Sequence, residues 1–526
     1  MQTTNRWLVS MLQKYFRRAR LLGKRAEADT SFRPGAGPIL MAAVTVLCAV
    51  ALTRCGGGSS TQAQTTTDNP ACSQGNKTFT NPDLPGMYPL SPGPAGTFFG
   101  INANGLSDVW PGTGIPLSSW RTLGASVKWA DINTAPGTYD FSRLDQWLSL
   151  AKSTNTDVMF TVYATPSWAS SRGKNSPSPN TCCAFQAQNG PGICDPPVDL
   201  NCDGTGSNET FISFLIALVQ HVGPGTIKYW ELWNEPNVGA EWNGDKDCAN
   251  SSVSNPGDIM LARMAKDLKT TITKFDPTAK FTTPAATGRD KAGSWLGRYL
   301  SNTDGGTYAD INAFHGYINS GACPSDCPVA EVVGDQIDHL NSLLPPSAQG
   351  KPLFDTEGSW GGAENPDGTH TTAITDPDQQ ASFVVRYYLI QMWKQVAKFY
   401  WWNWDIGKAT AFYNSTDHLL TAPGNAYVRV VQWTDGGAST VGPCAKNPSV
   451  PTQWTCTITS STRTVSVPIW DTSQTCDGGS CTTTPVNLQS IGLESFNAYR
   501  DLFGNTTTIT DGTVPVGLRP VLLIHQ

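Results

Sequence analysis

Short apolar, β-branched or aromatic runs alternate with segments of helical periodicity through most of this 526-residue chain. Each run has the length of a single strand, and in the segments between them apolar residues recur every three or four positions. The predicted strands are Thr97–Ile101, Ala125–Trp129, Asp157–Tyr163, Ile227–Trp233, Lys280–Thr283, Asp310–His315, Pro352–Thr356 and Lys398–Trp404. The predicted helices include Phe141–Lys152, Thr210–Val222, Asp258–Phe275, Val332–Leu343 and Asp378–Lys394.

Eight strands that alternate with helices indicate the α/β class and a (β/α)8 TIM barrel. The rival fold is an open α/β sheet, but no glycine-rich phosphate loop follows the first strand. From about Tyr427 the helical pattern ends, and alternating runs separated by Gly, Asn and Asp indicate an antiparallel β-sandwich. These runs are Trp454–Ile458, Thr464–Trp470, Ala498–Leu502, Thr506–Ile509 and Arg519–Ile524. We therefore expect a barrel over residues 97–415 and an accessory β-sandwich over residues 416–526.

The first 55 residues have the features of an export segment. A basic stretch precedes Ile39–Leu52, an uncharged apolar run of about 14 residues, which is short for a membrane span but typical of a signal-peptide core. Leu52-Thr-Arg-Cys55 and the GGGSS after it resemble the lipobox of bacterial lipoproteins, except that Arg54 replaces a small residue. We expect a secreted, cell-surface or periplasmic protein with a lipid on Cys55; the alternatives are simple secretion, an uncleaved anchor and an internal start. Residues 56–96, rich in Gly, Ser, Thr and Pro, are expected to be a tether and lead-in.

The charge of the remaining chain limits its partners. Residues 1–55 hold nine Lys and Arg and two Asp and Glu, so 27 basic and 40 acidic side chains remain, a net charge of −13. An acidic surface repels phosphate backbones, so nucleic acid is not an expected partner. We expect contact with a membrane only through the N-terminal lipid or signal anchor.

The cysteines agree with export. Of the 14 cysteines, 12 remain when Cys48 and Cys55 are set aside, and an even number in an oxidising compartment favours disulfides. Zinc binding is the alternative, but no histidine stands beside these cysteines. We expect Cys323–Cys327 and Cys476–Cys481 among the bridges. Further cysteines gather in one loop-like segment: Cys182, Cys183, Cys194 and Cys202.

One segment has the opening of a calcium loop. Asp199-Leu-Asn-Cys-Asp203-Gly204 matches the D-x-N-x-D-G start, but the twelfth position is Thr210 instead of glutamate. The alternative interpretation is a disulfide-bearing turn that caps the following helix.

Two glutamates stand at the ends of predicted strands. In YWELWNEPN (residues 229–237) alternate residues share a face, which groups Glu231, Trp233 and Glu235, and Pro236 ends the strand. Glu235 therefore lies at the C-terminal rim, where barrel active sites are found, and Glu231 lies lower and is expected to be structural. In PLFDTEGSW (residues 352–360) Glu357 ends a second strand. Both carboxylates are expected at one barrel mouth.

A carboxylate pair of this kind suits the hydrolysis of glycosidic bonds with retention, in which an acid and a nucleophile lie about 5–5.5 Å apart. For its role as acid, we expect Glu235 to have a raised pKa through burial beside Trp233 and the charge of Glu357. Glu357 has to stay ionised, which requires donors such as Tyr317 or His315. This chemistry needs no metal and no organic cofactor.

WNEP and TEGSW resemble the clan of retaining (β/α)8 glycoside hydrolases, in which the two catalytic glutamates end strands four and seven. The resemblance spans roughly residues 97–410. Three further segments look most similar to glycoside hydrolase family 39, the β-xylosidase and iduronidase group: VKWADINTAPGTYDFSRLDQWL, TVYATPSWAS and NAFHGY. DLFGN, DGTVPVG and PVLLI resemble the β-sandwich often attached to such barrels.

Position by position, the resemblance implies that Glu235 is the acid/base, that Glu357 is the nucleophile, and that Asn234 bonds the 2-hydroxyl of the sugar. Lys128 stands where many relatives have an arginine. The other implied substrate contacts are His315, Tyr317 and either Trp402 or Trp404 as a stacking platform. His315 is alternatively a structural histidine. Three more tryptophans either line the cleft or belong to the core: Trp168, Trp233 and Trp360.

The expected function is that of a monomeric retaining glycoside hydrolase. Its expected partner is an oligo- or polysaccharide substrate, a β-linked glycan of plant or microbial origin and of the xylan or β-glucan type. One alternative is a transglycosylase, because a sugar hydroxyl can capture the same covalent intermediate. Another is a non-catalytic glycan-binding protein on the cell surface, which the presence of both glutamates disfavours.

Overall fold

The computed structural model describes residues 98–526 except 104–109, 112–114, 116, 172–191, 240, 289–290, 319–328, 362–373 and 406–409. Eight parallel strands form one sheet in the order β5-β4-β3-β2-β1-β8-β7-β6. They are β1 (Phe99–Asn102), β2 (Ser119–Arg121), β3 (Asp157–Val162), β4 (Tyr229–Leu232), β5 (Lys280–Phe281), β6 (Asn312–His315), β7 (Leu353–Gly358) and β8 (Lys398–Trp402). Parallel bridges from Thr282 to Ile311 and from Ala286 to Phe314 join the two edges. The predicted barrel is confirmed.

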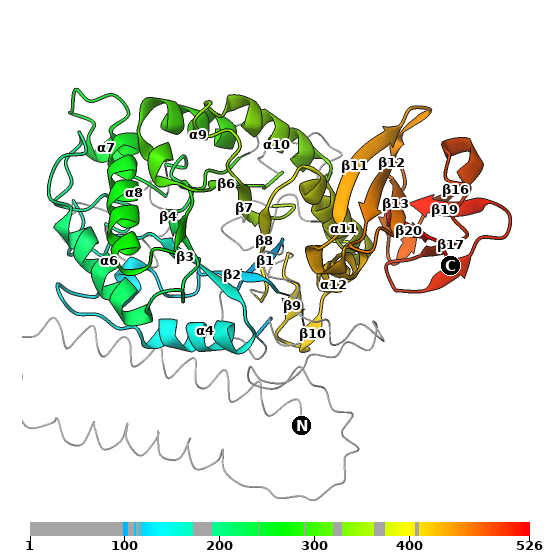
Figure 1. Ribbon diagram of the computed structural model, residues 1–526, viewed down its shortest axis with the longest axis horizontal. Helices are drawn as coiled ribbons and strands as arrows, with labels where there is room; N and C mark the ends of the chain where they lie inside the picture. Colours follow the sequence, from blue (N-terminus) through cyan, green and yellow to red (C-terminus); the bar gives the residue numbers. More distant parts are fainter. Residues whose placement is uncertain are drawn as a thin grey trace, which may run out of the picture. The chain divides into compact units, whose positions relative to one another are not determined.

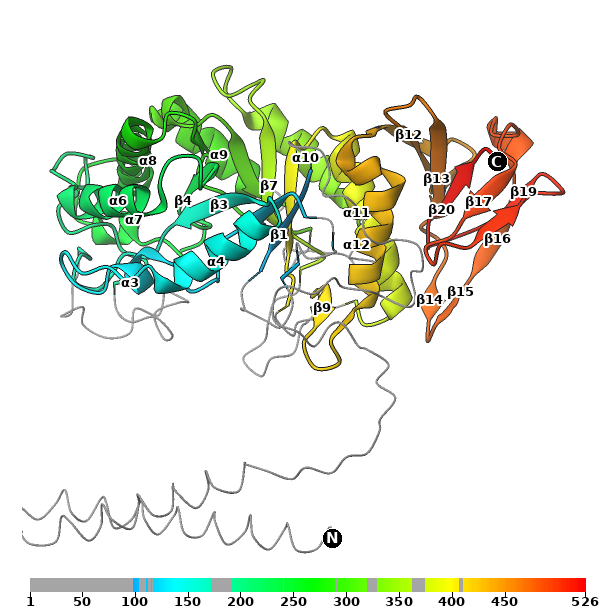
Figure 2. The same cartoon turned by 60° about the horizontal axis from the view of Figure 1, so that its bottom comes forward.

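Helices surround this sheet on its outer face, as Figures 1 and 2 show. They are α3 (Trp129–Ile132), α4 (Ser142–Ser153), α6 (Glu209–Val222), α7 (Gly244–Asp247), α8 (Pro256–Phe275), α9 (Lys291–Asn302), α10 (Val332–Leu343), α11 (Pro377–Trp393) and α12 (Ala422–Trp433). The five predicted helices are present, each within two residues of its expected bounds. The expected end of the helical pattern near Tyr427 is wrong, because Thr421 caps α12 and this helix continues to Trp433.

The second predicted strand is also wrong. We expected Ala125–Trp129, but the strand is β2, Ser119–Arg121. Gly124 has a φ of 78° and Ser126 a φ of 59°, so neither has extended backbone, and Trp129 begins α3 instead. The short polar sequence Ser-Trp-Arg gave no apolar run to recognise. This correction moves the end of the second strand from Trp129 to Arg121.

Large side chains fill the lower part of the barrel interior. The ring of Tyr400 packs there with four apolar or aromatic residues from neighbouring strands: Met159, Tyr229, Ile311 and Phe354. The Tyr400 hydroxyl lies 2.7 Å from Ser119 Oγ, so its polar end is satisfied. A Cβ on Gly100 would lie 2.6 Å from the Tyr400 ring, which explains why β1 carries a glycine at this close approach.

An antiparallel β domain follows α12, as predicted. Its main sheet has the order β11-β12-β13-β20-β17-β18, and β16 pairs with β19. The strands are β11 (Thr440–Asn447), β12 (Val450–Thr459), β13 (Val465–Asp471), β16 (Thr483–Asn487), β17 (Ala498–Arg500), β18 (Thr506–Thr508), β19 (Thr513–Gly517) and β20 (Val521–Ile524). A second apolar cluster lies between them and includes Val467, Val486, Val514 and Leu523.

Every cysteine within the described residues is in a disulfide. Cys476–Cys481 forms as predicted, and Cys202–Cys248 and Cys444–Cys456 are two further bridges. The predicted bridge Cys323–Cys327 lies outside the described residues. The same holds for Cys182 and Cys183, and for the export segment with Cys55. Within the described part of the chain, no helix is long and apolar enough to cross a membrane.

The calcium-like segment has the structure of a capping turn. Asp199 accepts hydrogen bonds from the backbone N–H of Thr210, at 3.1 Å, and from its hydroxyl, at 2.6 Å. Thr210 lies in the first turn of α6, so Asp199 caps this helix. Asp203 accepts from Thr205, and Cys202 ties the turn to Cys248. These contacts correspond to the alternative interpretation, a disulfide-bearing cap.

A hydrogen bond to a buried ion pair of the barrel connects the barrel to the β domain. Arg386 on α11 donates to both oxygens of Glu331, which precedes α10, at 2.9 and 3.1 Å. Trp470 on β13 donates its indole N–H to Glu331 Oε1 at 2.6 Å. The Trp470 ring lies parallel to that of Trp454, with 6.1 Å between the centroids. The β domain thus supplies one of the donors that satisfy a buried charge of the barrel.

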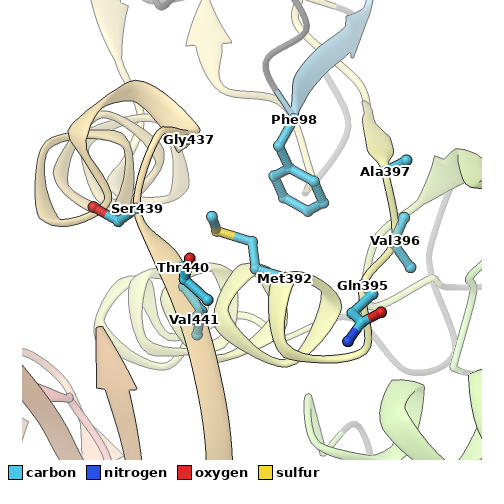
Figure 3. A pocket seen from close by; sticks show the side chains of 9 residues that line it. All are labelled: Phe98, Met392, Gln395, Val396, Ala397, Gly437, Ser439, Thr440 and Val441. Carbon is cyan, nitrogen blue, oxygen red and sulfur yellow. The ribbon is translucent and has the colours of Figure 1, made fainter. Parts of the chain in front are cut away.

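A cavity of about 320 Å³ lies near this junction, at the opposite end of the barrel from the two glutamates. Figure 3 shows Phe98 and Met392 pointing into it. Phe98 precedes β1 and Ala397 precedes β8, so the cavity opens at the N-terminal ends of the strands. It is therefore separate from the rim where Glu235 and Glu357 lie.

We predict that Trp470→Phe lowers the free energy of unfolding by about 1–3 kcal/mol, because it removes a donor from a buried carboxylate. Trp454→Phe is the matched control, since it changes the other ring of the same pair without touching Glu331. Chemical denaturation of both variants measures the difference. Equal losses for the two variants would contradict the role given to the indole N–H.

Candidate active site

The two predicted glutamates come together at the C-terminal ends of the strands. One carboxylate oxygen of Glu235, one of Glu357 and a ring nitrogen of His315 all lie within 4.8 Å of one another. His315 Nδ1 lies 2.7 Å from Glu235 Oε1. The side chain of Glu235 is 16% exposed and that of Glu357 is 9% exposed, whereas His315 is fully buried. The site is therefore compact and largely buried.

A bulge in β7 aims Glu357 into the barrel. Phe314 pairs with Asp355, but the next residue, His315, pairs with Glu357, so β7 contains one extra residue, Thr356. Phe354 packs inside the barrel and Asp355 meets Gln391 on α11. Without the extra residue, regular alternation would place Glu357 on the outer face.

The chain also leaves regular strand geometry at the end of β4. Trp233 has a φ of 62° and Glu235 a φ of 42°, both in the left-handed region that bulky residues rarely adopt. The expectation that Glu231, Trp233 and Glu235 share one face is therefore wrong at Trp233. Its ring packs against Trp242 at a centroid distance of 4.5 Å. This turn brings Asn234 and Glu235 to the site together, and strain of this kind is common at functional sites.

Arg121, which ends β2, is the residue that sequence analysis missed. Its side chain is fully buried, and its Nε and Nη2 both lie 2.7 Å from Glu231 Oε2. Nη1 donates to Glu357 Oε2 at 2.7 Å, and Nη2 donates to Asn234 Oδ1 at 3.0 Å. Nη2 also lies 3.4 Å from His315 Nε2. Burial lowers the pKa of Arg121, but the charges of Glu231 and Glu357 outweigh it and raise the pKa above its usual value.

Lys128 precedes α3, and its Nζ lies 3.1 Å from Asp131. A charge contact to Glu357 is made by Arg121. Glu231 is fully buried below the rim and also accepts from Thr161 at 2.8 Å, in agreement with the expected structural role.

Donors on two sides hold the Glu357 carboxylate. The Tyr317 hydroxyl donates to Oε1 at 2.7 Å, and Arg121 donates to Oε2 at the same distance. Burial and the charge of Glu357 raise the pKa of Tyr317 well above its usual value, so its hydroxyl keeps its proton. These two donors fix the orientation of the carboxylate.

The proton balance of Glu235 differs from the expectation. Burial raises its pKa, but the hydrogen bond and the charge of His315 outweigh burial, and the pKa of Glu235 is lowered. Burial lowers the pKa of His315, whereas the charges of Glu357 and Glu235 raise it, and the net direction is upward. The hydrogen bond between His315 Nδ1 and Glu235 Oε1 therefore couples the protonation of the two groups.

The predicted tryptophans differ in how far their side chains are exposed. Trp233, Trp360 and Trp404 are buried, and the face of Trp404 stacks on Tyr413 at a centroid distance of 5.4 Å. Trp404 has no exposed surface in this structure. Trp402 and Trp168 are partly exposed and remain the candidates for contact with a ligand.

Glu235, His315 and Glu357 also form the one group within the described residues with the composition and spacing of metal ligands. The guanidinium of Arg121 occupies Glu357 Oε2, and His315 Nδ1 faces Glu235. A fixed positive charge at this distance repels a cation. The donor set therefore suits proton transfer and nucleophilic attack better than metal binding.

A third carboxyl group, Glu241, belongs to the same site and was also missed. It lies six residues after Glu235 and is partly exposed, and its carboxyl group is close enough to Asn234 and Glu235 for both to influence its pKa. Burial and then the charge of Glu235 raise the pKa of Glu241 well above its usual value. The sequence signal was present, since an acidic residue in the loop directly after a catalytic candidate lies near the same rim.

No protein-family model matches the chain, and no curated protein matches it. Among solved structures, a glucosidase from Croceicoccus marinus shares 12% identity with a TM-score of 0.48, covering 81% of this chain and 95% of the other. A monomeric β-xylosidase from Caulobacter crescentus CB15 shares 13% with a TM-score of 0.49, covering 83% and 97%. A glycoside hydrolase family 30 subfamily 8 xylanase from Clostridium acetobutylicum shares 13% with a TM-score of 0.46, covering 81% and 95%. Because these scores and identities are low, function has to be argued from the site itself.

We predict that Arg121→Met lowers the free energy of unfolding by about 3–5 kcal/mol, because it leaves the buried carboxylate of Glu231 without its cation. The double variant Arg121→Met with Glu231→Gln removes that charge as well and is expected to recover part of the loss. Urea denaturation of the two single variants and the double variant measures the coupling. Strictly additive losses would contradict the ion pair as the main effect.

Asp355 leads to a prediction about pH. Burial raises its pKa from 3.8 to about 7, against hydrogen bonds from Gly316 and Gln391 that lower it. Because the folded pKa lies above the unfolded one, the stability that Asp355 contributes is fully present below about pH 4 and is lost as the pH rises through about 7. In Asp355→Asn, which resembles the protonated form, we expect a flatter decline of stability between pH 4 and pH 8 in thermal unfolding. A variant with the same pH dependence as the wild type would contradict this assignment.

Proposed function

We propose that this protein is a retaining glycoside hydrolase with Glu357 as nucleophile and Glu235 as acid/base. The observation that carries this proposal is the proximity of the two carboxylates, whose nearest oxygens lie within 4.8 Å. Retaining enzymes have carboxyl groups about 5–5.5 Å apart, whereas inverting enzymes leave about 6.5–9.5 Å for a water molecule. The short distance favours direct attack on the anomeric carbon.

The surroundings of Glu357 suit a nucleophile. Arg121 and Tyr317 hold its two oxygens from different sides, which fixes the direction of attack. Attack forms an ester between Glu357 and the anomeric carbon and releases the aglycone oxygen. Negative charge develops on the aglycone oxygen, and this oxygen accepts a proton from the Glu235 carboxyl group.

His315 and Glu235 together supply and accept this proton. At 2.7 Å, the proton held by His315 Nδ1 can pass to Glu235 before the leaving group departs. Once the ester has formed, the charge of Glu357 is gone and the strongest influence that raises the pKa of His315 is lost. Glu235 then removes a proton from the attacking water, and hydrolysis of the ester restores the starting state.

We propose a β-linked glycan of the xylan or β-glucan type as substrate. The support is the motif resemblance to family 39, together with partly exposed aromatic faces at Trp402 and Trp168. The disulfides suit an oxidising compartment outside the cytoplasm, with lipid attachment at Cys55 as the proposed anchor. Transglycosylation remains the second candidate, since it differs only in the acceptor that opens the ester.

We predict that Glu357→Ala lowers kcat on 2,4-dinitrophenyl β-D-xylopyranoside or β-D-glucopyranoside by several orders of magnitude, because the covalent route is lost. Azide is expected to enter the vacated space and give a glycosyl azide of inverted configuration. In Glu235→Ala, azide is expected to give the retained product, because it opens the ester. NMR of the two products distinguishes the roles.

Glu494→Ala, which removes an exposed carboxylate from the β domain, is the matched control and is expected to keep wild-type activity. Near-wild-type rates in both active-site variants, or an inverted first product from the wild type, would refute the assignment. Sugar transfer to an added xyloside or glucoside in preference to water would identify a transglycosylase.

A further inference from the structure

Gly316 joins the two residues that contact the proposed catalytic carboxylates. Before it in the chain, His315 Nδ1 lies 2.7 Å from Glu235 Oε1. After it, the Tyr317 hydroxyl donates to Glu357 Oε1 at 2.7 Å. The N–H of Gly316 itself donates to the backbone carbonyl of Glu357 at 2.9 Å. The position of Gly316 therefore sets how the end of β6 meets the proposed nucleophile on β7.

Two side chains hold the polar backbone groups of Gly316 from the outer side of the sheet. Asp355 Oδ1 accepts from the Gly316 N–H at 2.9 Å, and the Tyr387 hydroxyl donates to the Gly316 carbonyl at 2.5 Å. The Tyr387 hydroxyl also lies 3.3 Å from Asp355 Oδ2, which accepts from Gln391, one turn further along α11. All three side chains are fully buried. A buried network of this kind favours a single arrangement of the backbone that it bonds.

The same two side chains pack directly against both strand ends. A Cβ on Gly316 would collide with Asp355 Oδ2 and would lie 2.6 Å from the Tyr387 hydroxyl oxygen. A Cβ on Gly358, the residue after Glu357, would lie 2.7 Å from that hydroxyl oxygen and 2.9 Å from Asp355 Oδ2. Glycine thus permits this close approach at both positions. The pair therefore contacts the backbone next to the nucleophile as well as the backbone next to Tyr317.

His315 has anchors of its own. Its backbone N–H donates to Ala286 O at 2.8 Å, and its carbonyl accepts from Gln336 Nε2 at 3.2 Å. These bonds hold His315 independently of the groups around Gly316. A disturbance at Gly316 is therefore expected to act mainly on Tyr317, whose side chain is partly exposed at the site.

We propose that Tyr387 and Asp355 are positioning residues that hold Gly316 so that the Tyr317 hydroxyl stays bonded to Glu357. This inference rests on the proposed glycosidase function and extends it to α11, outside the barrel sheet. Both side chains act through the backbone of Gly316 and take no part in bond making or proton transfer. A misplacement of about 1 Å at a reacting group can cost about 100-fold in rate, so a distant bond of this kind can affect turnover.

The first test compares two hydroxyl deletions by kcat/KM on the same 2,4-dinitrophenyl β-glycosides. Tyr387→Phe keeps the ring, which packs against Phe383 and Phe399, and we expect a loss of about 3- to 10-fold, the value of one hydrogen bond. Tyr388→Phe is the matched control at the next position of α11. The Tyr388 hydroxyl is buried and has no hydrogen-bond partner within the described residues, so this variant is expected to stay within about 2-fold of the wild type.

A double-mutant cycle with Tyr317→Phe distinguishes positioning from a general loss of structure. Because Tyr387 is proposed to act through the Tyr317 hydroxyl, Tyr387→Phe is expected to change kcat/KM by less than about 2-fold in the Tyr317→Phe background. Equal losses in the two backgrounds, or an equal loss in Tyr388→Phe, would overturn the inference. Asp355→Ala removes the acceptor of the Gly316 N–H and repeats the cycle if Tyr387→Phe does not fold.

Glu357→Ala, assayed in parallel, separates this inference from the proposed function. Activity that survives in Glu357→Ala refutes the glycosidase mechanism. If Glu357→Ala is inactive and the losses in the cycle are additive, only the positioning role of Tyr387 and Asp355 is refuted.

Discussion

The candidate site depends on one buried cation. Arg121 has no exposed surface and bonds Glu231 below it, Glu357 beside it and Asn234 above it. A guanidinium in the interior of a barrel is tolerated only when carboxylates offset its loss of hydration. Glu231 and Glu357 both bond this guanidinium, so Glu357 is not its only partner. Arg121 thus holds the Glu357 carboxylate in place.

The irregular backbone of β7 and of the residues after β4 also brings side chains to Arg121. Side chains of β2, β4, β6 and β7 have to converge around one guanidinium, and regular alternation does not provide this. The extra residue in β7 and the left-handed residues Trp233 and Glu235 each redirect one carboxylate inward. Such conformations persist because buried contacts hold them, among them the packing of Trp233 on Trp242.

The barrel could be predicted from the sequence because its strands and helices are periodic, and both glutamates could be found because each ends an apolar run. Arg121 was missed because Ser119–Arg121 is too short and too polar for a recognisable strand. Ala125–Trp129 alternates apolar and polar residues as a strand does, but it contains the positive φ of Ser126. The pKa of Glu235 was predicted in the wrong direction. The burial of Glu235, which raises its pKa, was correctly expected. The hydrogen bond from His315, which lowers the pKa, depends on the ends of β4 and β6 lying close together at the rim, and no local sequence pattern reveals this.

The hydrogen bonds of Glu331 join the β domain to the barrel. The apolar core is continuous from α11 and α12 into the β domain, through Val441, Ile458 and Leu522. Trp470 also completes the hydrogen bonding of a barrel carboxylate. The β domain therefore lacks the independence of a tethered binding module, and a truncated barrel would expose apolar surface together with an incompletely bonded charge. The two parts are expected to unfold in one cooperative transition, so domain swaps between proteins of this type should retain the partner of Glu331.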